Sequence, residues 1–152
     1  MKKPIVVAEP EEIVDASNLI LGRMASYVAK KALTGKTIVV VNAERAVISG
    51  TKERVVARAK QKLKTRTLGN LERGPTHPRK PDHYVRRVIR GMLPWKKTGG
   101  KQAFHRVKVY IGTPSEYLDR PATRVADADA SRLRVPYITV AQLSGEIGGY
   151  PQ

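Results

Sequence analysis

The pattern of apolar positions in the first third of the chain predicts a strand, a helix and a second strand. Residues Glu12–Ala16 form a short β-branched run, which is typical of a strand. From Leu21 onward, apolar residues recur at spacings of three and four, so a helix is expected over about residues 19–33, with Gly35 as its stop. The β-branched run Thr37–Ala43 is typical of a strand buried on both faces, which helices are expected to cover.

The next part of the chain predicts a basic helix followed by a long loop. After a short extended piece at Val47–Ser49, a thin apolar stripe that includes Val56 and Leu63 predicts a helix over residues 52–66. Residues 68–82 contain two Gly and three Pro, so they are expected to form an extended loop. Its basic residues suggest that it becomes ordered on a polyanion, and a mobile surface loop is the alternative.

Helical spacing returns over residues 83–92, and Pro94 is expected to end that helix. Residues 95–106 are rich in Lys and Gly and are interpreted as a second basic loop. Apolar and polar residues then alternate over residues 107–111, which predicts a strand at a sheet edge.

Strands that alternate with helices favour an α/β fold. We expect a three-layer α/β/α domain over residues 1–112, with a mainly parallel sheet of about four strands and extended basic loops. Residues 113–152 carry weaker patterns broken by proline, and we interpret them as a C-terminal extension packed on the domain or on a partner.

The distribution of charge adds a candidate function to this fold. The 152-residue chain has a net charge of +16 at pH 7. Residues 52–108 hold eighteen Lys and Arg against three acids, so nearly all of the excess lies in this basic segment. Such concentration costs self-repulsion and indicates a polyanionic partner, whereas a solvated helix face is the usual interpretation of shorter runs. We therefore expect nucleic-acid binding.

Composition also limits the other classes of protein. The chain contains no Cys, which excludes thiol catalysis and Cys-ligated metal sites. Its apolar runs are far shorter than the roughly 20 residues that span a bilayer, and no secretory signal is recognised at residues 1–10, so no membrane partner is expected. Only three aromatic residues, Tyr84, Trp95 and Phe104, fall within the basic segment, which favours phosphate contacts over base stacking.

No motif for catalysis is recognised. Gly35-Lys36-Thr37 resembles the end of a phosphate-binding loop, but the first glycine of that motif is missing and the order of helix and strand is reversed. The three histidines lack the spacing of a metal site, and only His83 adjoins an acid within the basic segment. We therefore expect no enzyme activity, no cofactor, no metal and no small-molecule substrate.

Several short motifs resemble one known family in their order and spacing. They are Ile13-Val-Asp-Ala16, Leu21-Gly-Arg-Met-Ala-Ser26, Val40-Val-Asn-Ala-Glu44, Ile48-Ser-Gly50, and Arg90-Gly-Met-Leu-Pro94 followed by Val109-Tyr-Ile-Gly112. Over about residues 12–114 the chain is similar to the large-subunit ribosomal protein L-thirteen family. The His-Ser/Thr-Gly-Tyr-Pro-Gly-Gly stretch of bacterial members is absent, so the chain resembles the archaeal and eukaryotic branch, and its length favours the archaeal side.

This resemblance implies a three-layer α/β domain without catalytic activity, located in the cytoplasm within the large ribosomal subunit. Its expected partners are large-subunit ribosomal RNA and neighbouring large-subunit proteins. A regulator that binds RNA away from the ribosome and an RNA-processing enzyme remain the alternatives. Arg23 lies within a family motif and is a second type of candidate beside the basic segment. The candidate RNA-binding residues are Arg23, Lys52, Arg54, Arg58, Lys60, Lys62, Lys64, Arg66, Arg73, Arg79, Lys80, Arg86, Arg87, Arg90, Lys96, Lys97, Lys101, Arg106 and Lys108.

Overall fold

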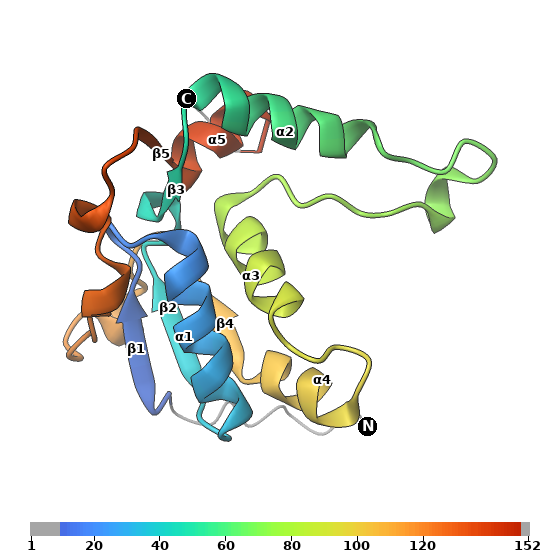
Figure 1. The fold of residues 1–152 in the computed structure, drawn as a ribbon. Coiled ribbons are helices and arrows are strands. Elements are labelled where there is room, and N and C mark those ends of the chain that lie inside the picture. The colour runs from blue at the N-terminus through green and yellow to red at the C-terminus, as the bar shows by residue number, and fades with distance from the viewer. Residues whose placement is uncertain (1–9, 150–152) are drawn as a thin grey trace.

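The computed structural model describes residues 10–149, which form an α/β body with a long arm that extends to one side (Figure 1). The N-terminal segment in which no secretory signal is recognised therefore lies outside the described residues, apart from Pro10. The same holds for the last three residues of the 113–152 segment. Within the described part of the chain, no helix is long and apolar enough to cross a membrane.

A parallel sheet forms the centre of the body, as expected for an α/β protein. Its three strands are β1 (Glu12–Asp15), β2 (Ile38–Val41) and β4 (Val107–Val109), in the order β1-β2-β4. All four residues of β2 are buried, as its unbroken apolar sequence predicts. The fourth extended piece expected from the sequence, β3 (Val47–Ser49), instead pairs in antiparallel fashion with β5 (Tyr137–Thr139) outside this sheet.

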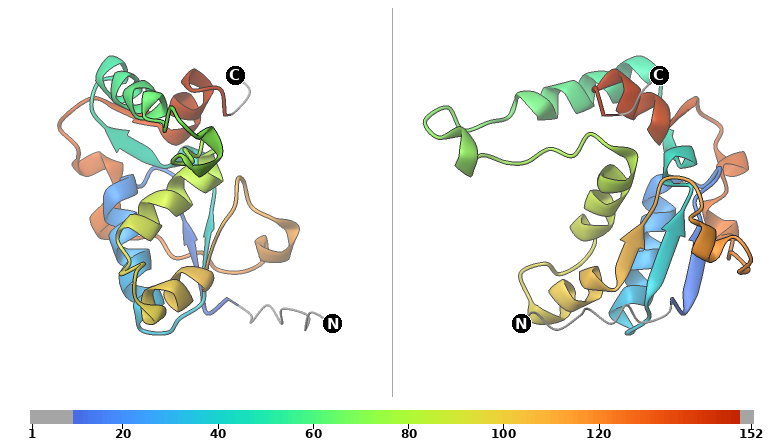
Figure 2. Two further views of the ribbon diagram at one scale, coloured as in Figure 1. Left: turned by 90° about the vertical axis from the view of Figure 1, so that its right-hand side faces the viewer. Right: turned by 180° about the vertical axis from the view of Figure 1, so that it is seen from behind.

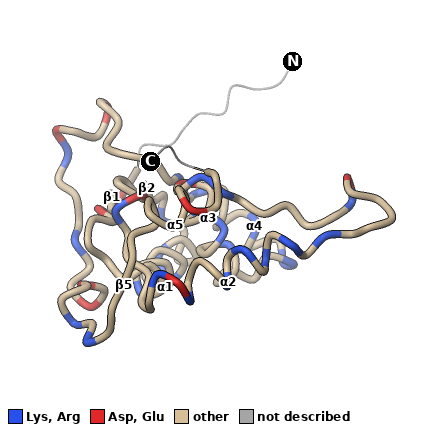
Figure 3. The backbone as a smooth tube through the Cα atoms, turned by 90° about the horizontal axis from the view of Figure 1, so that it is seen from above, with Lys and Arg blue, Asp and Glu red and all other residues tan. Residues whose placement is uncertain are grey.

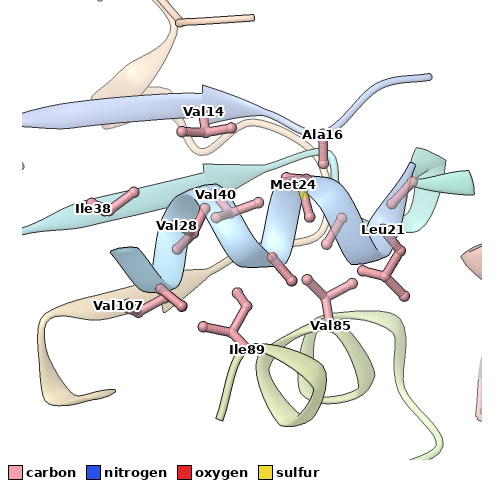
Figure 4. Close-up of a cluster of buried hydrophobic side chains, with 14 of the residues drawn as sticks. Val14, Ala16, Leu21, Met24, Val28, Ile38, Val40, Val85, Ile89 and Val107 are labelled. Carbon is pink, nitrogen blue, oxygen red and sulfur yellow. The ribbon is translucent and has the colours of Figure 1, made fainter. Parts of the chain in front are cut away.

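The main core lies between this sheet and two helices, α1 (Leu21–Leu33) and α3 (Pro81–Gly91). Figure 4 shows α1 between the strands and α3, with side chains from all three layers meeting around it. Met24 and Val28 of α1 are fully buried, as are Val85 and Ile89 of α3. Both helices match the helical spacing of the sequence, and α1 ends as predicted before Gly35, whose φ of +104° suits glycine.

The opposite face of the sheet carries a smaller apolar cluster. Here Ile13, Val39 and Val41 pack against Tyr117 of the short 3₁₀ helix η3 (Ser115–Tyr117). The third layer at this cluster is therefore one 3₁₀ turn contributed by residues beyond the parallel strands.

Hydrogen bonds join the ends of two strands through Asp15. Its Oδ1 accepts from the Nδ2 of Asn42 at 2.9 Å and from the backbone N–H of Ser17 at 3.0 Å. Burial raises the pKa of Asp15, but these hydrogen bonds lower it by more, so the pKa lies below its ordinary value. They also hold Asn42 in the left-handed conformation, at φ 54°, where the chain leaves β2.

The loop expected over residues 95–106 was a wrong prediction, because this segment contains α4 (Thr98–His105). The Gly99-Gly100 pair lowers helix propensity and hid the helix in the sequence. Packing explains why this helix forms and why residue 100 is a glycine. Ala103 is fully buried, and a Cβ at Gly100 would overlap the carbonyl group of Pro94.

The C-terminal residues continue into α5 (Val140–Glu146), which follows β5 directly. Thr139 and Gln142 form a capping box at its start, and Val140 and Leu143 are buried. The two views of Figure 2 show α5 beside α2 (Lys52–Lys64), the helix that forms the first half of the arm. Whether a domain boundary falls at residue 112 stays a prediction.

Candidate nucleic-acid interface

The arm consists of residues 52–80, namely α2, a tip that includes the 3₁₀ helix η2 (Leu71–Arg73), and an extended return segment (Figure 1). Helix α2 follows directly from β3, and only Val56 along its length is buried. Val56 packs with Ile138, Leu143 and Ile147, so the thin apolar stripe seen in the sequence anchors the arm to β5 and α5. The remaining faces of α2 are free for charged side chains.

Seven of the candidate cations lie on this helix or just beyond its end, and all seven are exposed. They are Lys52, Arg54, Arg58, Lys60, Lys62, Lys64 and Arg66. Seen from above, Lys and Arg recur along α2 toward the tip of the arm (Figure 3). The helix therefore presents a continuous row of positive charge on a support that buries one side chain, Val56.

The tip is held by local hydrogen bonds. Asn70 Oδ1 accepts from the backbone N–H groups of Glu72 and Arg73 and so caps η2. His77 Nε2 lies 2.9 Å from the carbonyl oxygen of Thr65, which connects the outgoing and returning segments. Arg73 is exposed at this tip.

The base of the arm is fixed by contacts with α5. Arg79 Nη1 donates to the carbonyl of Ile147 at 3.1 Å, and the hydroxyl of Ser144 donates to the carbonyl of Arg79. At the other side of the base, Lys52 Nζ lies 2.7 Å from Glu146 Oε1. That hydrogen bond and the charge of Lys52 lower the pKa of Glu146. Arg79 and Lys52 thus take part in holding the arm, in addition to being candidate RNA contacts.

Two arginines of α3 are held against aromatic rings. The guanidinium of Arg90 lies 4.1 Å from the ring centroid of Trp95, and that of Arg86 lies 4.6 Å from the ring centroid of Phe104. The two rings meet edge to face at 5.1 Å. Stacking restricts these long side chains, so less rotamer freedom is lost when they bind a partner. The arginines are evident in the sequence, but this arrangement is not, because Phe104 belongs to the unexpected α4.

The other candidate residues lie at different places on the body, apart from Lys80 at the end of the arm. Lys80, Arg87, Lys96, Lys97 and Lys101 are exposed, and Lys108 is half-buried on β4. Two others donate to backbone carbonyls, Arg23 to Asp127 at 2.9 Å and Arg106 to Ala32 at 3.5 Å. The structure therefore brings the arm cations together in a row and places Arg23 apart from them on α1.

Few of these charges are neutralised within the protein. Among residues 10–149, Lys52 is the one member of the nineteen candidates that forms an ion pair with a carboxylate. Apart from Lys52 and from Arg79, which donates to the carbonyl of Ile147, the cations of the arm are exposed, and Arg86 and Arg90 of α3 stack on rings. None of these charges is neutralised by a carboxylate of the described residues, so they remain available to an external polyanion.

Comparisons with known proteins indicate the family of this chain. The family model of ribosomal protein L13 matches residues 10–116. The chain belongs to the ribosomal protein L13 family. It is 46% identical over 151 residues to "Large ribosomal subunit protein uL13" of Methanopyrus kandleri, which covers 96% of this chain and 91% of that protein. It is 47% identical over 141 residues to the protein of the same name from Sulfolobus acidocaldarius, covering 92% and 95% of the two chains.

These relatives are archaeal, which confirms the branch expected for this L13 chain. Membership of a ribosomal protein family also agrees with the expectation that the chain is not an enzyme. In the described part of this L13 protein, no group of three or more His, Cys, Asp or Glu is placed to hold a metal ion.

Proposed function

We propose that this L13 protein is a structural component of the large ribosomal subunit, located in the cytoplasm, that binds large-subunit ribosomal RNA through phosphate contacts. In this role it supports subunit assembly and translation beside neighbouring large-subunit proteins. The family match and the printed names of the archaeal relatives support the ribosomal part of the proposal.

The observation that carries the RNA-binding part is the row of exposed cations along the arm. Helix α2 buries one residue and exposes seven Lys and Arg in or next to it. Neutralising RNA phosphates releases condensed counterions, which favours binding and makes it depend on salt. Each phosphate contact also removes part of the repulsion between neighbouring cations of the arm.

Arginine and lysine have different roles in this interface. The stacked guanidiniums of Arg86 and Arg90 are suited to bidentate phosphate contacts in a fixed orientation. The lysines of the arm act as mobile point charges that follow the phosphate backbone. Such contacts position a protein on folded RNA by shape rather than by base sequence.

Salt dependence of binding to deproteinised large-subunit ribosomal RNA tests this mechanism. If six to ten phosphates are neutralised, affinity falls by roughly 10³- to 10⁵-fold between about 50 and 200 mM salt. An affinity that barely changes over this range would contradict a phosphate-based interface.

Charge variants with the same net charge identify the surface that binds. The arm variant Lys60→Gln, Lys64→Gln, Arg66→Gln removes three exposed cations, and the control Lys30→Gln, Lys36→Gln, Arg134→Gln removes three from elsewhere. We expect the arm variant to reduce the slope of log affinity against log salt by about three and the control to leave it nearly unchanged. Equal effects would indicate nonspecific attraction to the whole protein.

The two alternatives, an RNA-binding regulator away from the ribosome and an RNA-processing enzyme, predict a different distribution in the cell. Sedimentation of native extract should place the protein with large subunits. A pool found entirely outside these particles would overturn the ribosomal proposal.

A further inference from the structure

A groove lies on the inner side of the arm, where the arm meets the body. It has a volume of about 720 Å³ and is bordered by α2, the return segment, α3, β3 and the start of α1. We call it the arm groove. Its apolar lining includes Ile48, Val55, Leu63, Pro78, Tyr84 and Val88. This volume falls within the roughly 300–1,000 Å³ range of sites that enclose small organic groups.

Positive charge surrounds this apolar space. Arg58 and Lys62 of α2 and Arg87 of α3 line the arm groove together with His77, and no Asp or Glu is among the lining residues. None of these three cations forms an ion pair within residues 10–149. The groove thus combines an apolar interior with a positively charged border, which is complementary to an anionic ligand.

An unstacked nucleotide has this combination of properties, because its base is flat and largely apolar on its faces while its phosphates are anionic. Tyr84 supplies a half-buried aromatic side chain in the lining, and burial raises the pKa of its hydroxyl. Arg58 and Arg87 lie on the two helices that border the space, so phosphates on either side of a single base have cations nearby.

We propose that the arm groove holds one unpaired nucleotide of the bound RNA, with its base among Leu63, Tyr84 and Val88 and its phosphates on Arg58, Lys62 and Arg87. The proposal rests on the proposed function, to which it adds a site that recognises an unstacked base. It also accounts for the few aromatic residues of the basic segment, since a single nucleotide requires one ring and not a stacking platform. A peptide from a neighbouring protein is the competing occupant, and it would need acidic residues at the same border.

A matched pair of variants tests the inference without changing charge. Ala59 lines the groove, whereas Ala57 is exposed on the same helix and is not among the lining residues. Ala59→Phe should fill part of the groove and weaken binding to deproteinised large-subunit ribosomal RNA about tenfold, the scale of one lost base-stacking contact. The salt slope should change by less than about one, because the variant keeps all the cations of the groove, and Ala57→Phe should alter affinity less than twofold.

Ultraviolet crosslinking of the unaltered protein in native large subunits provides a measurement that does not depend on how a variant folds. We expect nucleotide adducts on peptides that contain Tyr84 or Leu63. Adducts to another protein at these peptides, or equal RNA affinity of Ala59→Phe and Ala57→Phe, would overturn the nucleotide site while salt-dependent binding of the unaltered chain still stood. Loss of that salt-dependent binding itself would overturn the proposed function as well.

Discussion

The body and the arm of this L13 protein are stabilised in different ways. In the body, three parallel strands, α1 and α3 enclose a continuous core in which many side chains are fully buried. In the arm, α2 buries only Val56, and large apolar residues at the tip such as Leu68 and Leu71 are 84% and 66% exposed. The body therefore supplies the free energy of folding, and the arm has the composition of a surface that binds a partner.

Charges also differ between these two regions. In the body, the carboxylate of Asp15 accepts hydrogen bonds from Asn42 and Ser17. Along the arm, cations such as Lys60 and Lys64 lie one helical turn apart, and neither forms an ion pair among the described residues. Removing the charge of Asp15 should therefore lower the free energy of unfolding, whereas removing a cation of the arm should raise it in the protein without RNA. The two changes have opposite signs, and both can be measured.

The largest expected effect comes from a substitution that creates a cavity in the core of the body. Ile89 is fully buried in the core, and Ile89→Ala should lower the free energy of unfolding by about 2–5 kcal/mol. The matched arm variant, Leu68→Ala, should change it by less than about 0.5 kcal/mol because that side chain is already exposed. Urea denaturation followed by circular dichroism measures both, and similar losses would mean that the arm has a core of its own.

A smaller effect is expected from the charge of Asp15. Since the pKa of Asp15 is lowered in the folded protein, its stabilisation is present above the ordinary value of about 3.8 and is lost as pH falls through the folded-state pKa. Asp15→Asn should cost about 1 kcal/mol at pH 6, at the low end for hydrogen bonds to a charged group, because the site is partly exposed. The cost should shrink as the pH falls below 3.8 and disappear once Asp15 is protonated in the folded protein.

Urea denaturation of both proteins at several pH values between 2 and 6 provides this measurement, with Glu72→Gln at the exposed tip as the control. If Asp15→Asn lowers the free energy of unfolding by the same amount at all pH values, the charge of Asp15 does not stabilise the fold.

The smallest expected effect is a gain in stability. Lys60 and Lys64 are four residues apart on α2, and like charges at this spacing destabilise a helix by roughly 0.2–0.5 kcal/mol. Lys64→Gln should therefore raise the stability of the free protein slightly at low salt, and the gain should disappear at about 1 M salt. Thermal unfolding at two salt concentrations tests this, and a destabilised variant would show that Lys64 has a structural contact.

The elements with a strong local pattern were predictable from the sequence. The apolar run of β2 and the periodic apolar residues of α1 and α3 correspond to a buried strand and two core helices. Helix α4 was missed because Gly99 and Gly100 weaken the local signal, and the helix is fixed by packing that a single sequence does not display.

The candidate site was also predictable only in part. Its charge was evident, since eighteen cations in residues 52–108 need no structure to be counted. Its shape was not, because the stacking of Arg86 on Phe104 depends on α4, and the arm groove joins residues from α1, β3 and α3 to the arm. Contacts between segments so far apart in the chain leave no periodicity in the sequence.

The support of the arm has a consequence for the order of events during synthesis. The strand that leads into α2 pairs with β5, and Arg79 at the end of the arm is held by α5, so both attachments wait for residues beyond 136. A growing chain therefore carries the cationic arm for about seventy residues before the elements that orient it have been made. Synthesis of β5 and α5 is then the step that converts a loosely attached basic segment into a directed one.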